Sequence, residues 1–269
     1  MELSEYQHHL YNLLCVIDDL CRKESVHYFL AYGTAIGALR EHGIIPWDDD
    51  IDIKVLRKDF ESFRQLMNSE LPSRYAFVDY SDHSGYFHDF IPRIVDTSID
   101  RMSPSDYEST CGGYLHKLAI DIFIVDNAPD TSIGRYLMQL QYKLIYGVAL
   151  SKRYSFSYAD YSPFSSIPVF FLRLIGKSIS YDKICQMYEH AMTRFQDSET
   201  KWRYISNALL ILKYQQFFPK DDFESTESVM FGNRSFPVNN GIHDELFRIY
   251  GNYMEPPADK GIYLTHMEG

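Results

Sequence analysis

The residues best suited to chemistry are four aspartates within five positions. Asp48, Asp49, Asp50 and Asp52 directly follow Pro46-Trp47. Two unit charges about 4 Å apart repel by about 1 kcal/mol in water, and by several times more in a partly buried site. A cluster this dense therefore needs a cation or raised pKa values, unless it stays splayed in solvent as an acidic turn.

Alternation along the chain predicts which of these acids share a face. Ile51, Ile53 and Val55 alternate with polar positions, which is typical of a strand. In such a strand Asp50 and Asp52 point to one side and the apolar residues to the other. We expect the apolar side to pack on the core. The two carboxylates would then face a hard, oxygen-preferring cation such as Mg²⁺, with Mn²⁺ as the alternative.

A calcium loop of the EF-hand type is excluded by the sequence alone. Counted from Asp48, such a loop needs glycine at its sixth position and glutamate at its twelfth, where this chain has Ile53 and Asp59. A further acid, Asp121, stands alone inside the apolar run 118–125, where an unpaired charge is costly. We expect Asp121 to face the same cation or, alternatively, to pair with a nearby Lys or Arg.

A possible phosphate-binding turn precedes the aspartates. The apolar and aromatic run 27–32 predicts a buried strand, and 35–41 predicts one or two helical turns. Gly33-Thr34 lies between them, where backbone N–H groups and the positive end of a helix dipole favour an anion. A Gly-Thr pair alone is more often a simple turn. Its interest comes from the short distance in sequence to Asp50-x-Asp52.

The elements that must position these residues indicate an α+β fold. Helices are predicted near 4–22, 60–67, 131–150, 169–177, 181–196 and 243–250, and strands near 51–55, 75–77, 91–94 and 118–125. A Ser/Tyr/Pro-rich loop is predicted over 151–168. We therefore expect a mixed-sheet catalytic core over 1–130 and a mainly helical region over 131–269 that completes the donor and acceptor site.

Composition excludes several classes of protein. The 269 residues include 22 Tyr and 18 Phe, which argues against disorder. The net charge of −11 argues against nucleic acid as a partner. The four cysteines form no C-x-x-C pair, so we expect free thiols in a reducing compartment. The N-terminus lacks signal-peptide features and no apolar run is long enough to span a bilayer, so a cytoplasmic protein is predicted.

These stretches closely resemble the LicD family of bacterial phosphocholine transferases, which is related to the fukutin-type ribitol-phosphate transferases. The resemblance is carried by Tyr32-Gly33-Thr34, Gly37 to Arg40, Gly43 to Asp52, and Arg57 to Phe60. Ile120 to Phe123 with Asp126 is similar to the family's second acidic strand, and Tyr250 to Pro257 to its closing motif. The likeness covers nearly the whole chain outside about 130–200. One departure is Phe123-Ile124, where the family pattern has Phe-Pro.

The resemblance implies a nucleotidyltransferase-like fold and a mechanism. Asp50 and Asp52 would hold Mg²⁺, and Asp121 would act as a third metal ligand or as the general base. Gly33 and Thr34 would contact the phosphates of a CDP-choline donor. A sugar hydroxyl would attack the phosphorus that carries choline, and CMP would leave. The family points to N-acetylgalactosamine in a teichoic acid, or to another cell-surface glycan precursor such as lipopolysaccharide.

Further candidate residues surround this centre. Three arginines are candidate donor-phosphate contacts, each with an ordinary surface or structural role as the alternative: Arg40, Arg57 and Arg93. Trp47, Asp48 and Asp49 are expected to support the acidic pair from beside it. Aromatic cages suit a quaternary ammonium, so 153–161 is a candidate donor or acceptor lid through Tyr154, Tyr158 and Asp160. The apolar run 167–175 predicts a buried helix. Its alternative is peripheral contact with the inner face of a membrane, if the acceptor is lipid-linked.

Other functions remain open on the sequence. The transferred group could be CDP-activated glycerol, ribitol or a phosphonate. A metal-dependent glycosyltransferase would use Asp-x-Asp with a UDP-sugar, although only about 47 residues precede the acids here. A plain nucleotidyltransferase would prefer an NTP. A non-enzymatic protein would use the acids as a structural ion site and bind no nucleotide.

Overall fold

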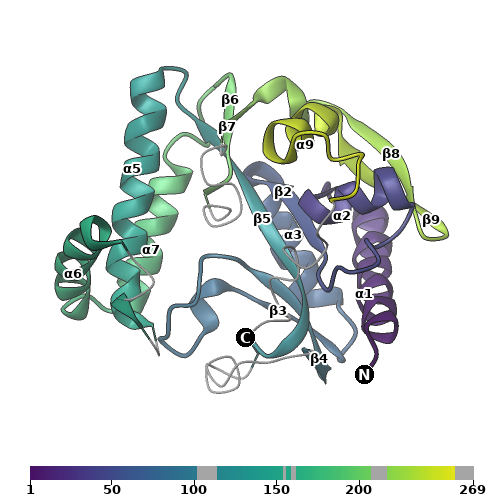
Figure 1. The fold of residues 1–269 in the computed structure, drawn as a ribbon, viewed down its shortest axis with the longest axis horizontal. Coiled ribbons are helices and arrows are strands. Elements are labelled where there is room, and N and C mark those ends of the chain that lie inside the picture. The colour runs from purple at the N-terminus through teal and green to yellow at the C-terminus, as the bar shows by residue number, and fades with distance from the viewer. Residues whose placement is uncertain (102–113, 154–155, 159–161, 207–216, 258–269) are drawn as a thin grey trace.

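A mixed sheet forms the centre of the protein. The computed structural model describes residues 1–101, 114–153, 156–158, 162–206 and 217–257. Its strands lie in the order β1, β2, β5, β4, β3, with β6 beside β5 and β7 beside β6 (Figure 1). Their bounds are β1 Phe29–Leu30, β2 Asp52–Leu56, β3 Tyr75–Val78, β4 Arg93–Asp100, β5 Lys117–Ala128, β6 Trp202–Tyr204 and β7 Phe217–Pro219. β2 and β5 are parallel, and the other described pairs are antiparallel.

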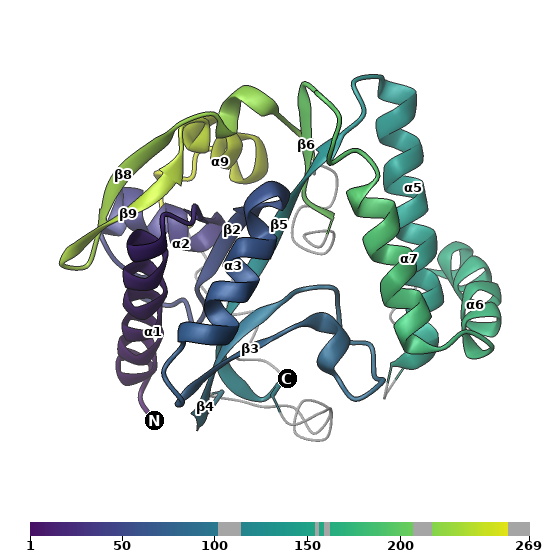
Figure 2. The same cartoon turned by 180° about the vertical axis from the view of Figure 1, so that it is seen from behind.

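Two long helices cover one face of this sheet. α3 (Arg57–Glu70) lies in front of β2 and β5 when the molecule is seen from behind, and α1 (Leu3–Glu24) stands beside it (Figure 2). Alternating residues of β2 and β5 join their apolar side chains in one core: Ile53, Val55, Ile120, Ile122 and Ile124. The intervening residues, including Asp52 and Lys54, therefore belong to the opposite face.

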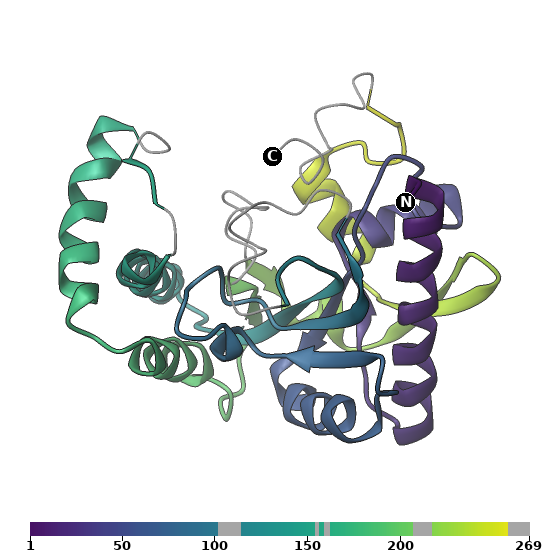
Figure 3. The same ribbon diagram turned by 90° about the horizontal axis from the view of Figure 1, so that it is seen from below.

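Three further helices lie beside the sheet. α5 (Ser132–Ala149), α6 (Pro163–Lys177) and α7 (Tyr181–Thr193) gather on the side away from α1 (Figure 3). They share a second, aromatic core with loop residues of the sheet region: Tyr80, Phe87, Phe90, Tyr142, Tyr188 and Tyr204. Within it, the rings of Phe90 and Tyr188 stack with centroids 4.1 Å apart.

A hairpin and a helix complete the described chain. β8 (Thr226–Phe231) and β9 (Arg234–Asn239) pair antiparallel and lead into α9 (Ile242–Tyr250). The hairpin packs on α1, where Tyr11 contacts the rings of Phe231 and Phe236. Short helical segments connect the larger elements: α2 Tyr32–Ile36, a π-helix Gly37–Glu41, and 3₁₀ turns at Tyr80–Asp82, Leu150–Lys152 and Lys220–Phe223.

The predicted α+β class is confirmed, and several boundaries differ. The region after 131 contains β6 to β9 as well as helices, and β6 joins it to the sheet through β5. α6 begins at Pro163 rather than near 169, because the Ser162 hydroxyl accepts a hydrogen bond from the Ser165 N–H and Pro163 suits the first helical turn. Among the described residues, no helix is both long and apolar enough to cross a bilayer.

The cysteines that the structure describes are free, as predicted. Cys15, Cys21 and Cys185 form no disulfide, and Cys111 lies outside the described residues. Burial raises the pKa of the Cys21 and Cys185 thiols to about 12, so at neutral pH both remain protonated and contribute as small apolar side chains.

Candidate active site

The parallel pairing of β2 and β5 brings two of the predicted acids together. Asp52 lies opposite Asp121 in the ladder, and Asp50 immediately precedes β2. Burial raises the pKa of the Asp52 carboxyl well above its ordinary value, and the charges of Asp50, Asp121 and Asp48 raise it further. Arg93 lowers it in part. Asp52 is therefore a buried carboxyl crowded by like charges, which favours either a proton or a cation beside it.

The glycine turn lies directly against this cluster. The Thr34 hydroxyl accepts a hydrogen bond of 2.8 Å from the backbone N–H of Asp52, so α2 and the start of β2 are tied together. A Cβ at Gly33 would lie 2.9 Å from a carboxylate oxygen of Asp48, so a side chain there would displace that carboxyl. Tyr32, just before the turn, has a φ of 44°, which is unfavourable for a bulky residue and typical of functional sites.

Asp48 is the second strongly perturbed acid. Burial, followed by the charge of Asp50 and a hydrogen bond with it, raises the pKa of Asp48 to about 9. The N-terminal part of α1 holds this loop, since the Gln7 amide donates hydrogen bonds to the carbonyl oxygens of Asp48 (2.7 Å) and Ile45 (3.1 Å). At neutral pH the Asp48 carboxyl therefore keeps its proton in the absence of a bound cation.

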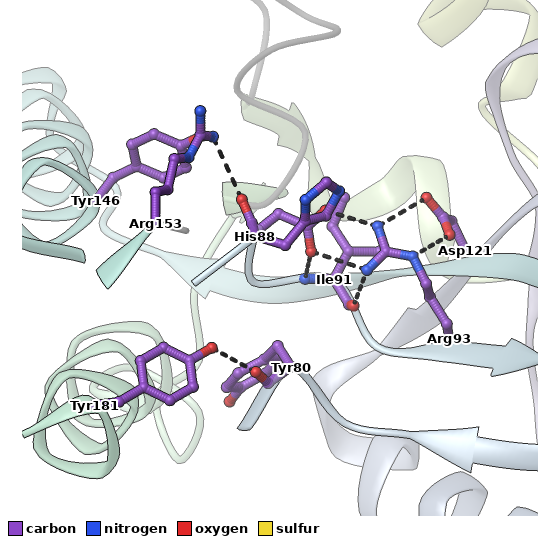
Figure 4. Close-up of polar contacts among 9 residues, drawn as sticks. Tyr80, His88, Ile91, Arg93, Asp121, Tyr146, Arg153 and Tyr181 are labelled. Carbon is purple, nitrogen blue, oxygen red and sulfur yellow. Dashed lines mark hydrogen bonds and ion pairs between the residues drawn. The ribbon is translucent and has the colours of Figure 1, made fainter. Parts of the chain in front are cut away.

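Arg93 connects the acidic strands to the segment that precedes β4. Its guanidinium lies 2.9 Å from a carboxylate oxygen of Asp121 and 2.6 Å from one of Asp89 (Figure 4). Burial raises the pKa of Asp89, but the charge of Arg93 and its hydrogen bonds outweigh burial and hold that pKa below its ordinary value. Asp121 thus forms the ion pair with an arginine that the sequence left open as the alternative to metal binding. Arg93 itself lies within the acidic cluster.

The same segment reaches the helical region. Arg153, just after α5, donates hydrogen bonds to the carbonyl oxygen of His88 (3.4 Å) and to the hydroxyl of Tyr146 (2.8 Å), and Tyr181 of α7 donates one to the carbonyl oxygen of Tyr80 (Figure 4). The loop that positions Arg93 is therefore fixed from α5 and α7 as well as from the sheet.

Two tyrosines from distant parts of the chain border the acids. Burial raises the pKa of the Tyr250 hydroxyl, at the end of α9, and Asp52, Asp50 and Asp48 raise it further. Burial also raises the pKa of Tyr6 on α1, where Asp49, Asp50 and Asp121 add to the effect and Arg101 opposes it. Neither tyrosine was predicted to have a role from its sequence context, although Tyr250 begins the closing motif.

The other candidate arginines lie away from the acids. Arg57 pairs with Asp126 at 2.6 Å and with Glu189 at 3.2 Å, at the opposite end of β2, where it lines a separate groove of about 700 Å³. Arg40 donates hydrogen bonds to Glu41 (2.7 Å) and to the carbonyl oxygen of Tyr253 (2.6 Å), which ties the π-helix to the closing segment. The structure does not bring Arg57 to the cluster, and it places the Arg40 guanidinium in a structural contact.

The remaining candidates have different placements. Trp47 packs beneath the Arg40 guanidinium, which lies 6.0 Å from its ring centroid, and Asp49 follows Asp48 beside the cluster. The hydroxyl of Tyr158 accepts a hydrogen bond of 3.2 Å from Arg173 of α6, at the outer edge of the molecule rather than beside the acids (Figure 1). Tyr154 and Asp160 lie outside the described residues.

The acidic cluster has the ligand type and the backbone positions that a divalent cation needs. Its described side chains, however, do not converge on one point. Carboxylate oxygens are the ligands that Mg²⁺ prefers, and Asp50, Asp52 and Asp121 lie on adjacent strand ends. Among the described residues, no three His, Cys, Asp or Glu side chains converge closely enough to hold a metal ion. Asp121 is turned toward Arg93, so ligation by all three acids would require its side chain to rotate.

An α+β sheet with a Gly-Thr turn and acids on two adjacent strands defines a nucleotidyltransferase-like domain. Comparison with known proteins agrees, since residues 25–102 match the family model "LicD/FKTN/FKRP, nucleotidyltransferase domain". The predicted resemblance to the LicD family is confirmed by this match over residues 25–102. The chain is also 26% identical to the lipopolysaccharide cholinephosphotransferase LicD of Haemophilus influenzae, over 100% of this chain and 97% of that protein.

Two shorter matches involve proteins of Rickettsia. An uncharacterized protein of Rickettsia typhi is 40% identical over 58 residues, which are 22% of this chain and 19% of that protein. One of Rickettsia prowazekii is 38% identical over 58 residues, 22% of each chain. These matches say nothing of a substrate.

Proposed function

We propose that this protein transfers phosphocholine from CDP-choline to a sugar hydroxyl of a cell-surface glycan precursor, with Mg²⁺ held by Asp50 and Asp52 and with Asp121 as a third ligand or as the general base. The observation that carries the proposal is the ladder position of Asp52 opposite Asp121, with Gly33-Thr34 directly against it. The similarity to a lipopolysaccharide cholinephosphotransferase along its length supports a choline-containing donor and a glycan acceptor.

The chain's own residues account for several parts of such a reaction. A bound divalent cation would supply charge neutralisation for the transferring phosphoryl group and the leaving CMP. Arg93 holds Asp121 at the edge of the site, where that carboxylate can orient the attacking hydroxyl or accept its proton. Gly33 and Thr34, in the first turn of α2 and beside the Asp48 carboxyl, would contact the phosphates of the donor.

Choline is favoured over other alcohols by a tyrosine ring near the acids. Tyr250, at the end of α9, is partly exposed and lies within electrostatic reach of Asp52, Asp50 and Asp48, whereas Tyr6 is buried in the core. A quaternary ammonium is attracted both to aromatic faces and to nearby carboxylates. Glycerol and ribitol carry no charge and would gain neither interaction, so this surrounding supports a cationic alcohol.

The direct test measures CMP release and thermal stabilisation. CDP-choline, CDP-glycerol, CDP-ribitol, UDP-sugars and NTPs are each supplied with Mg²⁺ or EDTA, and lipopolysaccharide or teichoic acid precursors serve as acceptors. A donor at 100 times its Kd stabilises by about 2.7 kcal/mol, or roughly 5–10 °C for a chain of this size. We expect a Mg²⁺-dependent shift with CDP-choline, and CMP release when an acceptor is present.

Matched variants assign the effect to the site. Asp52→Asn keeps the side-chain shape and is expected to lower CMP release at least roughly 100-fold, whereas Asp182→Asn, an exposed acid on α7, leaves it unchanged. A response to another CDP-alcohol alone would change the donor. A response only to UDP-sugars or NTPs, or to no nucleotide at all, would overturn the proposal.

A further inference from the structure

The outer side of α6 carries a continuous stripe of exposed apolar residues. Five large side chains recur at helical spacing and are each at least half exposed: Ile167, Phe170, Phe171, Leu174 and Ile175. The inner side is already filled, since a Cβ at Gly147 of α5 would lie 2.5 Å from Leu172, and one at Gly176 would lie 2.3 Å from the carbonyl oxygen of Val148. The helix predicted to be buried therefore packs on α5 with one face and exposes its other apolar face.

α5 continues this surface. It exposes its own apolar stripe along the side away from the aromatic core: Ile133, Tyr136, Leu137, Leu140 and Leu144. Spacings of four and three residues separate Leu140 from Leu144 and Leu144 from Gly147, so all three lie on one side of the helix. Because Gly147 is where α6 crosses, the stripe of α5 leads to α6. A groove of about 410 Å³ lined by Tyr158, Ile167 and Phe170 lies on the same outer surface.

The charge of this part of the chain is opposite to that of the remainder. From the start of α5 to the end of α6 there are six of the chain's 26 basic residues and only one of its 37 acidic residues, Asp160. The basic residues are Arg135, Lys143, Lys152, Arg153, Arg173 and Lys177. Within the described residues none of them forms an ion pair. Lys143 and Lys177 are exposed, whereas Arg135 and Arg173 lie over aromatic rings and Arg153 donates hydrogen bonds to neighbouring residues.

We propose that this α5–α6 surface, defined by its two apolar stripes and the exposed Lys143 and Lys177, docks on an anionic lipid bilayer. Exposed apolar side chains enter the boundary between headgroups and acyl chains, while neighbouring Lys and Arg side chains attract anionic headgroups. α6 lies at the outer edge of the molecule, with α5 and α7 between it and the sheet (Figures 1 and 2). A flat membrane can therefore reach it.

A second copy of the chain fits this surface less well. A symmetric pair would bring the same face of both chains together, and the exposed lysines of each would repel those of the other. An anionic surface has the opposite effect. The proposal does not depend on which group the enzyme transfers, because docking involves neither the acidic cluster nor a nucleotide.

Vesicle flotation tests the proposal with the full chain and no nucleotide. We expect binding to vesicles of equal parts phosphatidylcholine and phosphatidylglycerol, weaker binding to phosphatidylcholine alone, and loss of binding as salt is raised. The double variant Phe171→Ser/Leu174→Ser should lower the partition coefficient at least about tenfold. Lys143→Gln and Lys177→Gln should each lower it about fivefold.

A matched control removes an exposed phenylalanine elsewhere. Phe247→Ser, on α9, is expected to leave partitioning unchanged, and thermal melting checks that each variant is folded. The proposal is overturned if the wild-type chain does not float with anionic vesicles, or if the α6 double variant floats equally well. It is also overturned if light scattering shows a dimer that the α6 variant dissociates and no vesicle binding accompanies it.

Discussion

Asp48→Asn should stabilise the metal-free protein, because it removes an acid that the fold holds protonated. Burial and the neighbouring Asp50 raise the pKa of Asp48 to about 9, whereas in the unfolded chain it is near its ordinary 3.8. Between these values the folded state binds a proton that the unfolded state has released. The free energy of unfolding therefore decreases as the pH rises from about 4 to about 9.

The size of the effect follows from the pKa difference between the two states. Each unit corresponds to about 1.4 kcal/mol, so the distance between the unfolded pKa of 3.8 and pH 7 amounts to about 4 kcal/mol. Asp48 is only half-buried by its exposed surface, and solvent screening reduces the expected gain in Asp48→Asn to about 2 kcal/mol. For this chain length that corresponds to a rise in Tm of roughly 4–8 °C.

Urea unfolding in EDTA, followed by far-UV circular dichroism at pH about 5 and about 8, measures this directly. The wild type should lose stability between the two pH values, and Asp48→Asn should lose less. Glu227→Gln, an exposed acid on β8, should behave as the wild type does. The interpretation of Asp48 as a crowded, protonated acid is refuted by either of two results. One is an equal loss of unfolding free energy between the two pH values in the wild type and in Asp48→Asn. The other is an Asp48→Asn variant less stable than the wild type at pH 8.

Other variants test how neighbouring side chains are held. Glu245→Ala leaves Lys54 without its partner at 2.6 Å in a fully buried site, and should lower the free energy of unfolding by about 3–5 kcal/mol in urea titrations; Lys54→Met combined with Glu245→Leu should regain most of it, and no recovery would contradict the pairing. By calorimetric titration, Arg93→Gln should weaken Mg²⁺-dependent CDP-choline binding at least about tenfold, whereas folded Arg57→Gln should change it less than about twofold; equal losses would contradict their separate placement. Gly37→Ala places a Cβ 2.4 Å from a backbone carbonyl oxygen of the following loop and should cost about 1–3 kcal/mol by thermal melting, so an unchanged Tm would show that the loop yields freely.

The acidic centre was predictable because its signal is local. Alternating apolar residues around Asp50 and Asp52 define the strand and its polar face within a few positions, and Asp121 stands out as a lone acid in an apolar run. The ladder places Asp52 opposite Asp121, whereas Asp50 lies just before the strand in which it was predicted. The motifs could not predict that Asp121 would pair with Arg93, because that contact depends on the register between β4 and β5.

The partners of the acids were not predictable from local patterns. Gln7 and Tyr6 reach the loop from a helix about forty residues earlier in the chain, and Tyr250 reaches it from about two hundred residues later. Asp89 lies in an irregular segment without periodicity. These contacts arise only from tertiary packing, whereas Asp50 and Asp52 are marked by their immediate neighbours.

The late strands were missed for a different reason. β7 and β9 each contain a proline, Pro219 and Pro237, which argues against a strand unless it lies at an edge. One signal was present: Gly232-Asn233 separates β8 from β9 as a two-residue turn, and Gly232 has a φ of 66°. Glycine with asparagine between two short runs is typical of a tight hairpin, so this hairpin could have been found.

The distribution of charge connects the two proposals. Arg93 is shared between Asp89 and Asp121, and Lys54 pairs with Glu245. Crowded, buried carboxyls such as Asp52 favour a proton or a cation beside them, while the exposed lysines of the α5–α6 surface attract an anion. Salt should separate the two, because it screens exposed lysines strongly and buried carboxylates much less. Raising ionic strength should therefore release the protein from anionic vesicles well before it abolishes Mg²⁺ binding at Asp52.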